Sequence, residues 1–303
     1  MDDNTAAVKV VSCFLLIVSC AAVAACLTAS WQVFRRRVWS LSLLLSTLVA
    51  SIASGAAVSV AATHGLGRSN ASDRELVVMQ KAFLAMEVFY MLTLTLGKLS
   101  VMVLFYSLLS STGRSGPVLA AMGVLVVWTL AMIFVICFQC HPPAVWNLTS
   151  GTCLDLTAVW AFVGAANILV EVVIVLVPSV IIARVQMSLK KRLVVIGCFS
   201  VRIMDIAVTS TQLHYVNAFG RAPLPLNIWE WVMCSQVLQT VTILTACVPY
   251  LREFLEAFPS GMFQPLEGGQ KATRQTYDGN KSMDSDVELV MRDESASKTS
   301  QKA

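Results

Sequence analysis

The sequence predicts an all-α membrane protein, a bundle of seven transmembrane helices with the amino terminus outside and the carboxyl terminus in the cytoplasm. Three observations predict this class. Apolar residues make up 56% of the chain and charged residues 13%, a balance typical of multi-pass membrane proteins. Seven apolar runs are each about long enough to cross a bilayer. Basic residues gather in short segments between these runs, so the net charge of +4 reflects topology rather than a nucleic-acid partner.

The seven apolar runs set the expected spans. A helix needs about 20 apolar residues to cross the hydrocarbon core. The expected spans are residues 10–27, 38–63, 83–108, 118–138, 159–182, 193–216 and 228–250. The first run follows a single lysine and also resembles a signal peptide. We interpret it as a span, because its removal would place both sequons of the outer loops in the cytoplasm.

Basic residues and sequons orient the bundle in the same way. With the amino terminus outside, nine basic residues lie in cytoplasmic segments and five in outer ones. The same orientation puts Asn70 and Asn147, each in an Asn-X-Ser/Thr sequon, in outer loops where glycosylation occurs. A third sequon at Asn280 falls on the cytoplasmic side and is interpreted as a chance match.

Two regions of different composition divide the chain. Residues 1–262 hold the apolar runs and form the predicted transmembrane domain. Residues 263–303 are rich in Gly, Ser, Asp, Lys and Gln and have too little apolar area to offset chain entropy. We expect a disordered cytoplasmic tail there, which can meet a signalling partner.

Four ionisable residues fall at one depth in the predicted bundle. Lys98 lies near the middle of the third run, so it needs an acidic partner on another helix. Arg202 and Asp205 are three residues apart and can pair on one helix face, which leaves Glu171 for Lys98. Two interpretations stay open: ion pairs that fix helix packing, or a polar pocket or relay that meets a ligand.

A second polar group is expected nearer the outer side. Glu87 precedes Lys98 by eleven residues, about 20° around a helix, so both should face the interior. Polar residues also recur at helical spacing along the seventh run. These positions predict an outward-open pocket, with ordinary hydrogen bonding between helices as the alternative. Its candidate residues are Glu87, Tyr90, Glu230, Gln236 and Gln239.

Cys140 and Cys153 flank the polar loop between the fourth and fifth runs. On the oxidising side of a membrane two such cysteines can close a loop, which stabilises the fold by roughly 3 kcal/mol in the chain-entropy model. We therefore predict a Cys140–Cys153 disulfide. The other seven cysteines lie in apolar runs, where small buried side chains are the ordinary interpretation.

An ordered set of short motifs resembles the fungal rhodopsin-domain family of integral membrane proteins, over roughly residues 31–263. The family includes receptor-like proteins and proteins associated with secondary-metabolite clusters. The matching pieces are Gly65-Leu66-Gly67-Arg68, Tyr90, Lys98-Leu99-Ser100, Leu104-Phe105-Tyr106, Phe138-Gln139-Cys140-His141-Pro142, Trp146, Gly151-Thr152-Cys153-Leu154-Asp155, Asn167, Pro178, Arg202 and Val248-Pro249-Tyr250-Leu251-Arg252. Many relatives carry two aspartates where this chain reads Trp39-Ser40-Leu41-Ser42. Functions that depend on those acids are not expected here.

Two functions remain in view. The first is a receptor-like protein that binds a small molecule, lipophilic ones included, from the outside. The alternative is a membrane-embedded enzyme or accessory protein of a secondary-metabolite pathway, acting on terpenoid or polyketide intermediates, with Glu171 or Asp205 as a buried acid. Whether the chain is an enzyme stays open.

Several other chemistries find no support in the sequence. Retinal is not expected as a cofactor, because its attachment needs a lysine that the seventh run lacks. His64, His141 and His214 show no metal-ligand spacing. No phosphate loop, nucleophile elbow or nucleic-acid patch is found. The expected partners are the lipid bilayer and a small molecule, in the plasma membrane or an endomembrane.

Overall fold

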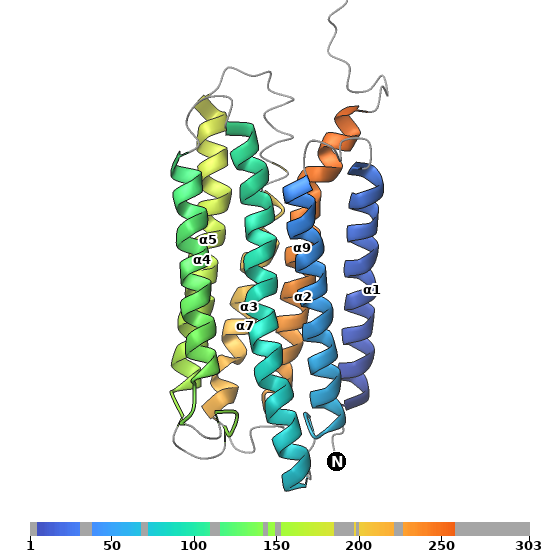
Figure 1. The fold of residues 1–303 in the computed structure, drawn as a ribbon, viewed down its shortest axis with the longest axis vertical. Coiled ribbons are helices and arrows are strands. Elements are labelled where there is room, and N and C mark those ends of the chain that lie inside the picture. Colours follow the sequence, from blue (N-terminus) through green and yellow to red (C-terminus); the bar gives the residue numbers. More distant parts are fainter. Residues whose placement is uncertain are drawn as a thin grey trace, which may run out of the picture. The chain divides into compact units, whose positions relative to one another are not determined.

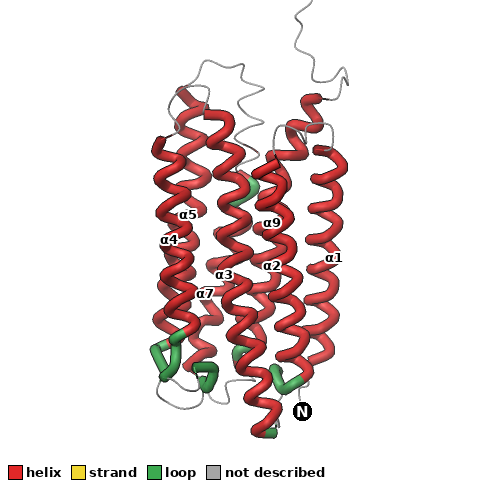
Figure 2. Tube along the Cα trace, viewed as in Figure 1, coloured by secondary structure: helices red, strands yellow, loops and turns green. Residues whose placement is uncertain are grey.

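The computed structural model describes residues 5–30, 38–67, 72–109, 116–141, 145–148, 153–184, 197, 200–220 and 227–257. Two compact units divide the chain, Met1–Phe254 and Leu255–Ala303. Apart from one isolated bridge, between Cys140 and Cys153, the secondary structure of the described residues is helical (Figure 2). The elements are α1 (Thr5–Ser30), α2 (Val38–Thr63), α3 (Asp73–Leu109), α4 (Gly116–Cys137), α5 (Leu156–Arg184), α7 (Ile203–His214), the 3-10 helix η3 (Tyr215–Gly220) and α9 (Trp229–Ala257) (Figure 1).

The helices of the first unit lie side by side and alternate in direction (Figure 1). The starts of α1, α3, α5 and α9 lie at the end that carries the Cys140–Cys153 bridge, which we call the disulfide end. Helix α2 packs between α1 and α3, α3 also packs on α4, and α5 packs on α7 and η3. The most extensive packing is between α2 and α3. Helix α3 therefore occupies a central place in the bundle.

Six of the described helices are long and apolar enough to cross a membrane. The candidate spans are Thr5–Thr28, Trp39–Thr63, Asp73–Ser107, Gly116–Cys137, Leu156–Val177 and Trp229–Tyr250. The predicted sixth span, residues 193–216, is described in part: α7 has 12 residues, and residues 193–196, 198 and 199 lie outside the described part. The chain is a multi-pass membrane protein, and the count of seven spans stays a prediction.

Many large apolar side chains on these helices are exposed, whereas many polar ones are buried. On α4, Val124, Val127 and Leu130 are exposed along one face, while Leu125 and Met132 are buried. In water this arrangement would be unfavourable, but in a bilayer the apolar face meets lipid. Polar side chains then have to find partners inside the bundle. The distribution is the one that a membrane bundle requires.

Two apolar clusters fill the interior, one toward each end. The cluster toward the disulfide end reaches Leu94 on α3 and Leu238 on α9. The second cluster begins at Val101 on α3 and at Ile243 on α9. Lys98 lies between the two clusters, and so do the polar positions of α9 around Thr242. A layer of polar and charged side chains thus separates two dry regions.

Helix α3 begins ten residues before the predicted span because a polar sequence starts it. The Ser72 backbone N–H donates to the Glu75 carboxylate at 2.8 Å, and the Glu75 N–H donates to the Ser72 hydroxyl at 3.4 Å. This reciprocal pair is a capping box. The apolar run that predicts the span begins only at Phe83, so apolar length alone misses this first part of the helix.

Candidate functional site

The buried charges form one connected layer across four elements. Lys98 on α3 and Arg202, at the start of α7, both reach Glu171 on α5. Lys98 Nζ lies 3.4 Å from Glu171 Oε1, and Arg202 Nη1 lies 2.9 Å from Glu171 Oε2. The exposed fractions are 3% for Lys98 and 1% for each of the other two. An unpaired charge at this depth has a high free-energy cost, and the Glu171 carboxylate offsets this cost for both Lys98 and Arg202.

Asp205 completes the charge balance through α9. Its two carboxylate oxygens accept hydrogen bonds from the hydroxyls of Thr242 and Thr245, each at 2.8 Å. The sequence predicts that Arg202 pairs with Asp205, but the closest carboxylate to Arg202 among the described residues is Glu171. Because hydroxyl groups of α9 already donate to both carboxylate oxygens of Asp205, Arg202 can pair with Glu171 on α5 instead. Two basic and two acidic side chains still share the layer.

An amide and a hydroxyl extend the layer between α5 and α7. Asn167 accepts a hydrogen bond from Lys98 and donates to the Thr209 hydroxyl at 2.9 Å. Thr209 in turn donates to the Asp205 backbone carbonyl at 2.7 Å. One donor of the layer is unused, because Arg202 Nη2 is buried and has no hydrogen-bond partner among the described residues. Most polar groups of the layer are therefore satisfied from a neighbouring helix.

Gly97 allows α9 to approach α3 beside Lys98. A Cβ at this position would lie 2.7 Å from the Thr242 methyl group. The hydroxyl of the same threonine is bonded to Asp205, so the side chain cannot rotate away without losing that bond. Glycine at position 97 is therefore part of what lets α9 reach the charge layer.

Glu87 occupies a separate buried site toward the disulfide end. Its carboxylate accepts hydrogen bonds from Trp160 Nε1 at 3.1 Å and Gln139 Nε2 at 3.3 Å. Glu87 is fully buried, and the described side chains that contact its oxygens are neutral. The rings of Tyr90, Trp160 and Trp231 pack together, with Tyr90 and Trp160 edge to face at 5.8 Å. This arrangement is a carboxyl group beside an aromatic cluster.

The other predicted pocket residues bond to neighbouring helices. Tyr90 donates to Gln212 Oε1 at 2.9 Å, and Gln212 Nε2 donates to the Ser235 hydroxyl at 2.7 Å. Gln236 and Gln239 both donate to a single serine, Ser54 on α2, at 3.2 and 3.0 Å. These contacts join α3 to α7, α7 to α9 and α9 to α2. Four of the five residues predicted for an outer pocket thus lie in the bundle interior.

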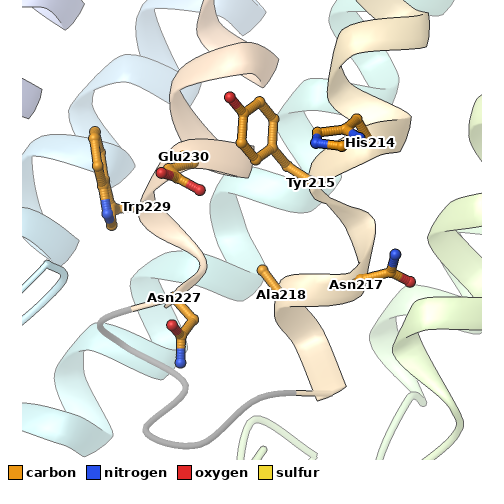
Figure 3. A pocket seen from close by; sticks show the side chains of 7 residues that line it. All are labelled: His214, Tyr215, Asn217, Ala218, Asn227, Trp229 and Glu230. Carbon is orange, nitrogen blue, oxygen red and sulfur yellow. The ribbon is translucent and has the colours of Figure 1, made fainter.

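Glu230 lines a pocket of about 220 Å³ at the disulfide end. The pocket lies where α7 and η3 meet the start of α9 (Figure 3). In this view the Tyr215 ring lies between His214 and Glu230. The seven lining residues are His214, Tyr215, Asn217, Ala218, Asn227, Trp229 and Glu230. Six of them carry a polar group, so the pocket suits a small polar molecule better than a lipophilic one.

The predicted disulfide is confirmed. Cys140 and Cys153 are bonded, with their Cα atoms 4.0 Å apart. Next to the bridge, the Leu154 N–H donates to the Gln139 carbonyl at 2.8 Å, so the loop is anchored where Gln139 reaches Glu87. Lys81 Nζ lies 4.4 Å from the centre of the Trp146 ring, a second contact of this loop with α3. Asn147, next to Trp146 in the same loop, is half-buried, whereas Asn70 lies outside the described residues.

Sequence reasoning missed several partners in these networks. Trp160, Asn167 and Glu171 are separated by seven and four residues, which places them on one face of α5. That spacing was available from the sequence once Glu171 had been placed inside. Thr242 and Thr245 are among the polar residues that recur along the seventh run, but predicting their bonds to Asp205 needs the relative rotation of two helices. The pocket residues contributed by η3 carried no sequence signal.

The comparison with known families decides the family. The fungal rhodopsin domain matches residues 27–257, about three quarters of the chain. The chain belongs to the fungal rhodopsin-domain family. The match spans the described elements from the end of α1 to the end of α9, so this fungal rhodopsin-domain protein carries its charge layer, disulfide and pocket within the family region.

One curated relative is informative about class. This fungal rhodopsin-domain protein is 25% identical, over 181 residues, to a SAT4 family membrane protein of Emericella nidulans. The alignment covers 57% of this chain and 45% of the relative, so the chain spans a little under half of that protein's length. No solved structure matches the chain. The membrane class and the family are thus established together.

Proposed function

We propose that this protein is a receptor-like seven-helix membrane protein that binds a small polar molecule in the pocket at the disulfide end. One observation carries the proposal: the pocket and the charge layer share two helices. His214 ends α7 at the pocket, and Asp205 lies near the start of α7 in the layer. Trp229 and Glu230 begin α9 at the pocket, and Thr242 on α9 bonds Asp205. A ligand that moves α7 against α9 therefore acts on the layer.

The proposed topology places the disulfide end outside and the carboxyl-terminal tail, residues 263–303, in the cytoplasm. A disulfide persists on the oxidising side of a membrane, which supports this orientation for the Cys140–Cys153 loop. The sequon at Asn147 lies in the same loop. The pocket is then open to extracellular or luminal ligands, and a signalling partner would meet the inner loops or the tail. Retinal has no part in the proposal, since α9 contains no lysine.

The experiment is a ligand screen with a blocked-pocket variant. Small polar compounds are tested for thermal stabilisation of the full-length protein in nanodiscs. Ala218→Phe fills the pocket, because Ala218 is buried in its lining, and it should abolish stabilisation by any compound that binds there. Ala56→Phe, at an exposed position of α2, is the control and should still bind. Compounds that stabilise both variants equally would contradict the proposal.

A second candidate function, a membrane-embedded enzyme, is favoured by Glu87. Glu171 is already paired with two cationic side chains. Glu87 instead is fully buried beside the rings of Tyr90 and Trp160, and no described cationic side chain contacts its oxygens, an environment that suits a proton donor to an apolar, electron-rich substrate. In a host that forms a suspected product, Glu87→Gln should stop conversion while the protein still inserts normally. Persistent conversion in that variant would remove the enzyme hypothesis.

A further inference from the structure

We infer that the pocket at the disulfide end selects a small organic cation, with Glu230 as its counter-ion. This inference rests on the proposed function, which requires that the pocket bind a small molecule but leaves the charge of that molecule open. Three features of the pocket carry the inference: the sign of its charge, the chemistry of its walls and its volume.

The charge of the lining favours a cation. Glu230 is the carboxylate among the seven lining residues, and none of the seven is a lysine or arginine. His214 lies at the other side of the Tyr215 ring in this view, with the two rings edge to face at 5.3 Å (Figure 3). An anionic ligand would meet the Glu230 carboxylate without a fixed positive charge among the lining residues. A cation would instead form an ion pair with it.

The remaining walls suit an ammonium group. Asn217 and Asn227 line the pocket, and their side-chain amides carry the kind of oxygen acceptor that the three donors of an ammonium group need. Tyr215 and Trp229 are also lining residues, and aromatic rings attract cations through the ring quadrupole. A divalent metal is a poorer fit, because the described part of the chain has no cluster of three or more His, Cys, Asp or Glu side chains.

The volume limits the size of the ligand. The pocket has a volume of about 220 Å³. Pockets for drug-sized ligands start at about 300 Å³. The expected ligand is therefore a small primary amine or quaternary ammonium compound with few polar groups, rather than a peptide or a lipid.

The test uses three probes of matched shape and different charge: tyramine, the neutral alcohol tyrosol and the anion 4-hydroxyphenylacetate. Binding to the full-length protein in nanodiscs is measured by isothermal titration. Tyramine should bind at least about tenfold more tightly than either analogue. Equal affinity for tyrosol would overturn the cation preference while leaving the pocket of the proposed function intact. Failure of all three probes to bind would overturn the inference as well.

Variants assign the preference to Glu230. Glu230→Gln removes the charge with little change of shape and should weaken tyramine binding at least about tenfold. Glu230→Asp keeps the charge and should retain most of the affinity. Asp73→Asn removes a charge at the same end of the bundle outside the pocket lining and should leave binding unchanged. Unchanged tyramine binding by a folded Glu230→Gln variant would overturn the inference.

Discussion

At the scale of single residues, glycines and polar side chains decide how closely the helices approach. Lys98 and Arg202 are buried, and each relies on Glu171. Asp205 relies on hydroxyls from α9, which can reach it because position 97 has no Cβ in their way. In a low-dielectric interior each lost partner is expensive, since the charge left behind has no water to solvate it. Small changes here should therefore have large effects.

Gly97→Ala should destabilise the protein, although alanine is the better helix former. The added Cβ would lie 2.7 Å from the Thr242 methyl, so either α9 moves or Thr242 releases Asp205. We expect a loss of about 1–3 kcal/mol in the free energy of unfolding, as in other overpacked sites. Unfolding by sodium dodecyl sulfate in mixed micelles measures it.

Gly123→Ala is the matched control. Nothing lies within 4 Å of a Cβ at position 123 on α4, so alanine should stabilise the helix by about 0.5–1 kcal/mol. Equal effects of the two substitutions would show that Gly97 has no special packing role.

Trp160→Phe should destabilise the site of Glu87. The substitution keeps an aromatic ring but removes the Nε1–H that donates to the buried carboxylate. An unsatisfied buried acceptor costs about 1–3 kcal/mol. Trp128→Phe is the comparison, since Trp128 packs edge to face on Phe162 at 5.3 Å and is half-buried. Thermal unfolding of both variants tests the difference, and a Trp160→Phe variant no less stable than Trp128→Phe would argue against a structural hydrogen bond to Glu87.

At the scale of elements, a predicted span agrees with its helix where the apolar run is bounded by polar or basic residues at both ends. The run 38–63 and α2 (Val38–Thr63) coincide. Helix α3 is longer than its run because Ser72 and Glu75 cap a polar first segment. The sequence predicts the pairing of Lys98 with Glu171 from their common depth and from an assumed Arg202–Asp205 pair, and Lys98 does lie beside Glu171. The preference of Arg202 for Glu171 over Asp205 could not follow, because it depends on helix rotation.

The loop between α4 and α5 gives a prediction at this scale. Replacing Cys140 and Cys153 together by serine opens the loop and should lower the free energy of unfolding by about 3 kcal/mol. It should also loosen Gln139 beside Glu87. Cys13→Ser with Cys20→Ser, two exposed free thiols on α1, is the control pair and should have little effect. Equal stability of the two double variants would contradict a structural role for the bridge.

At the scale of the whole molecule, the proposed topology predicts which sequon carries sugar. Asn147 lies within the loop closed by the Cys140–Cys153 disulfide, at the end proposed to face outside. When the protein is made in a eukaryotic host, Asn147→Gln or Asn70→Gln should each remove one glycan. Glycosidase treatment should then shift the variant's band on a gel less than it shifts the band of the unaltered protein. Asn280→Gln should change nothing. Sugar on Asn280 alone would reverse the orientation.

The charge layer joins α3, α5, α7 and α9, so it holds the bundle together near the middle of its spans. A double-mutant cycle on Lys98→Met and Glu171→Gln, followed by unfolding in mixed micelles, tests this claim most directly. Each single variant should lose about 3–5 kcal/mol, because a buried charge is left without its partner. The double variant should lose less than the sum, with a coupling of about 0.5–3 kcal/mol. Single losses below about 0.5 kcal/mol, or strictly additive ones, would contradict it.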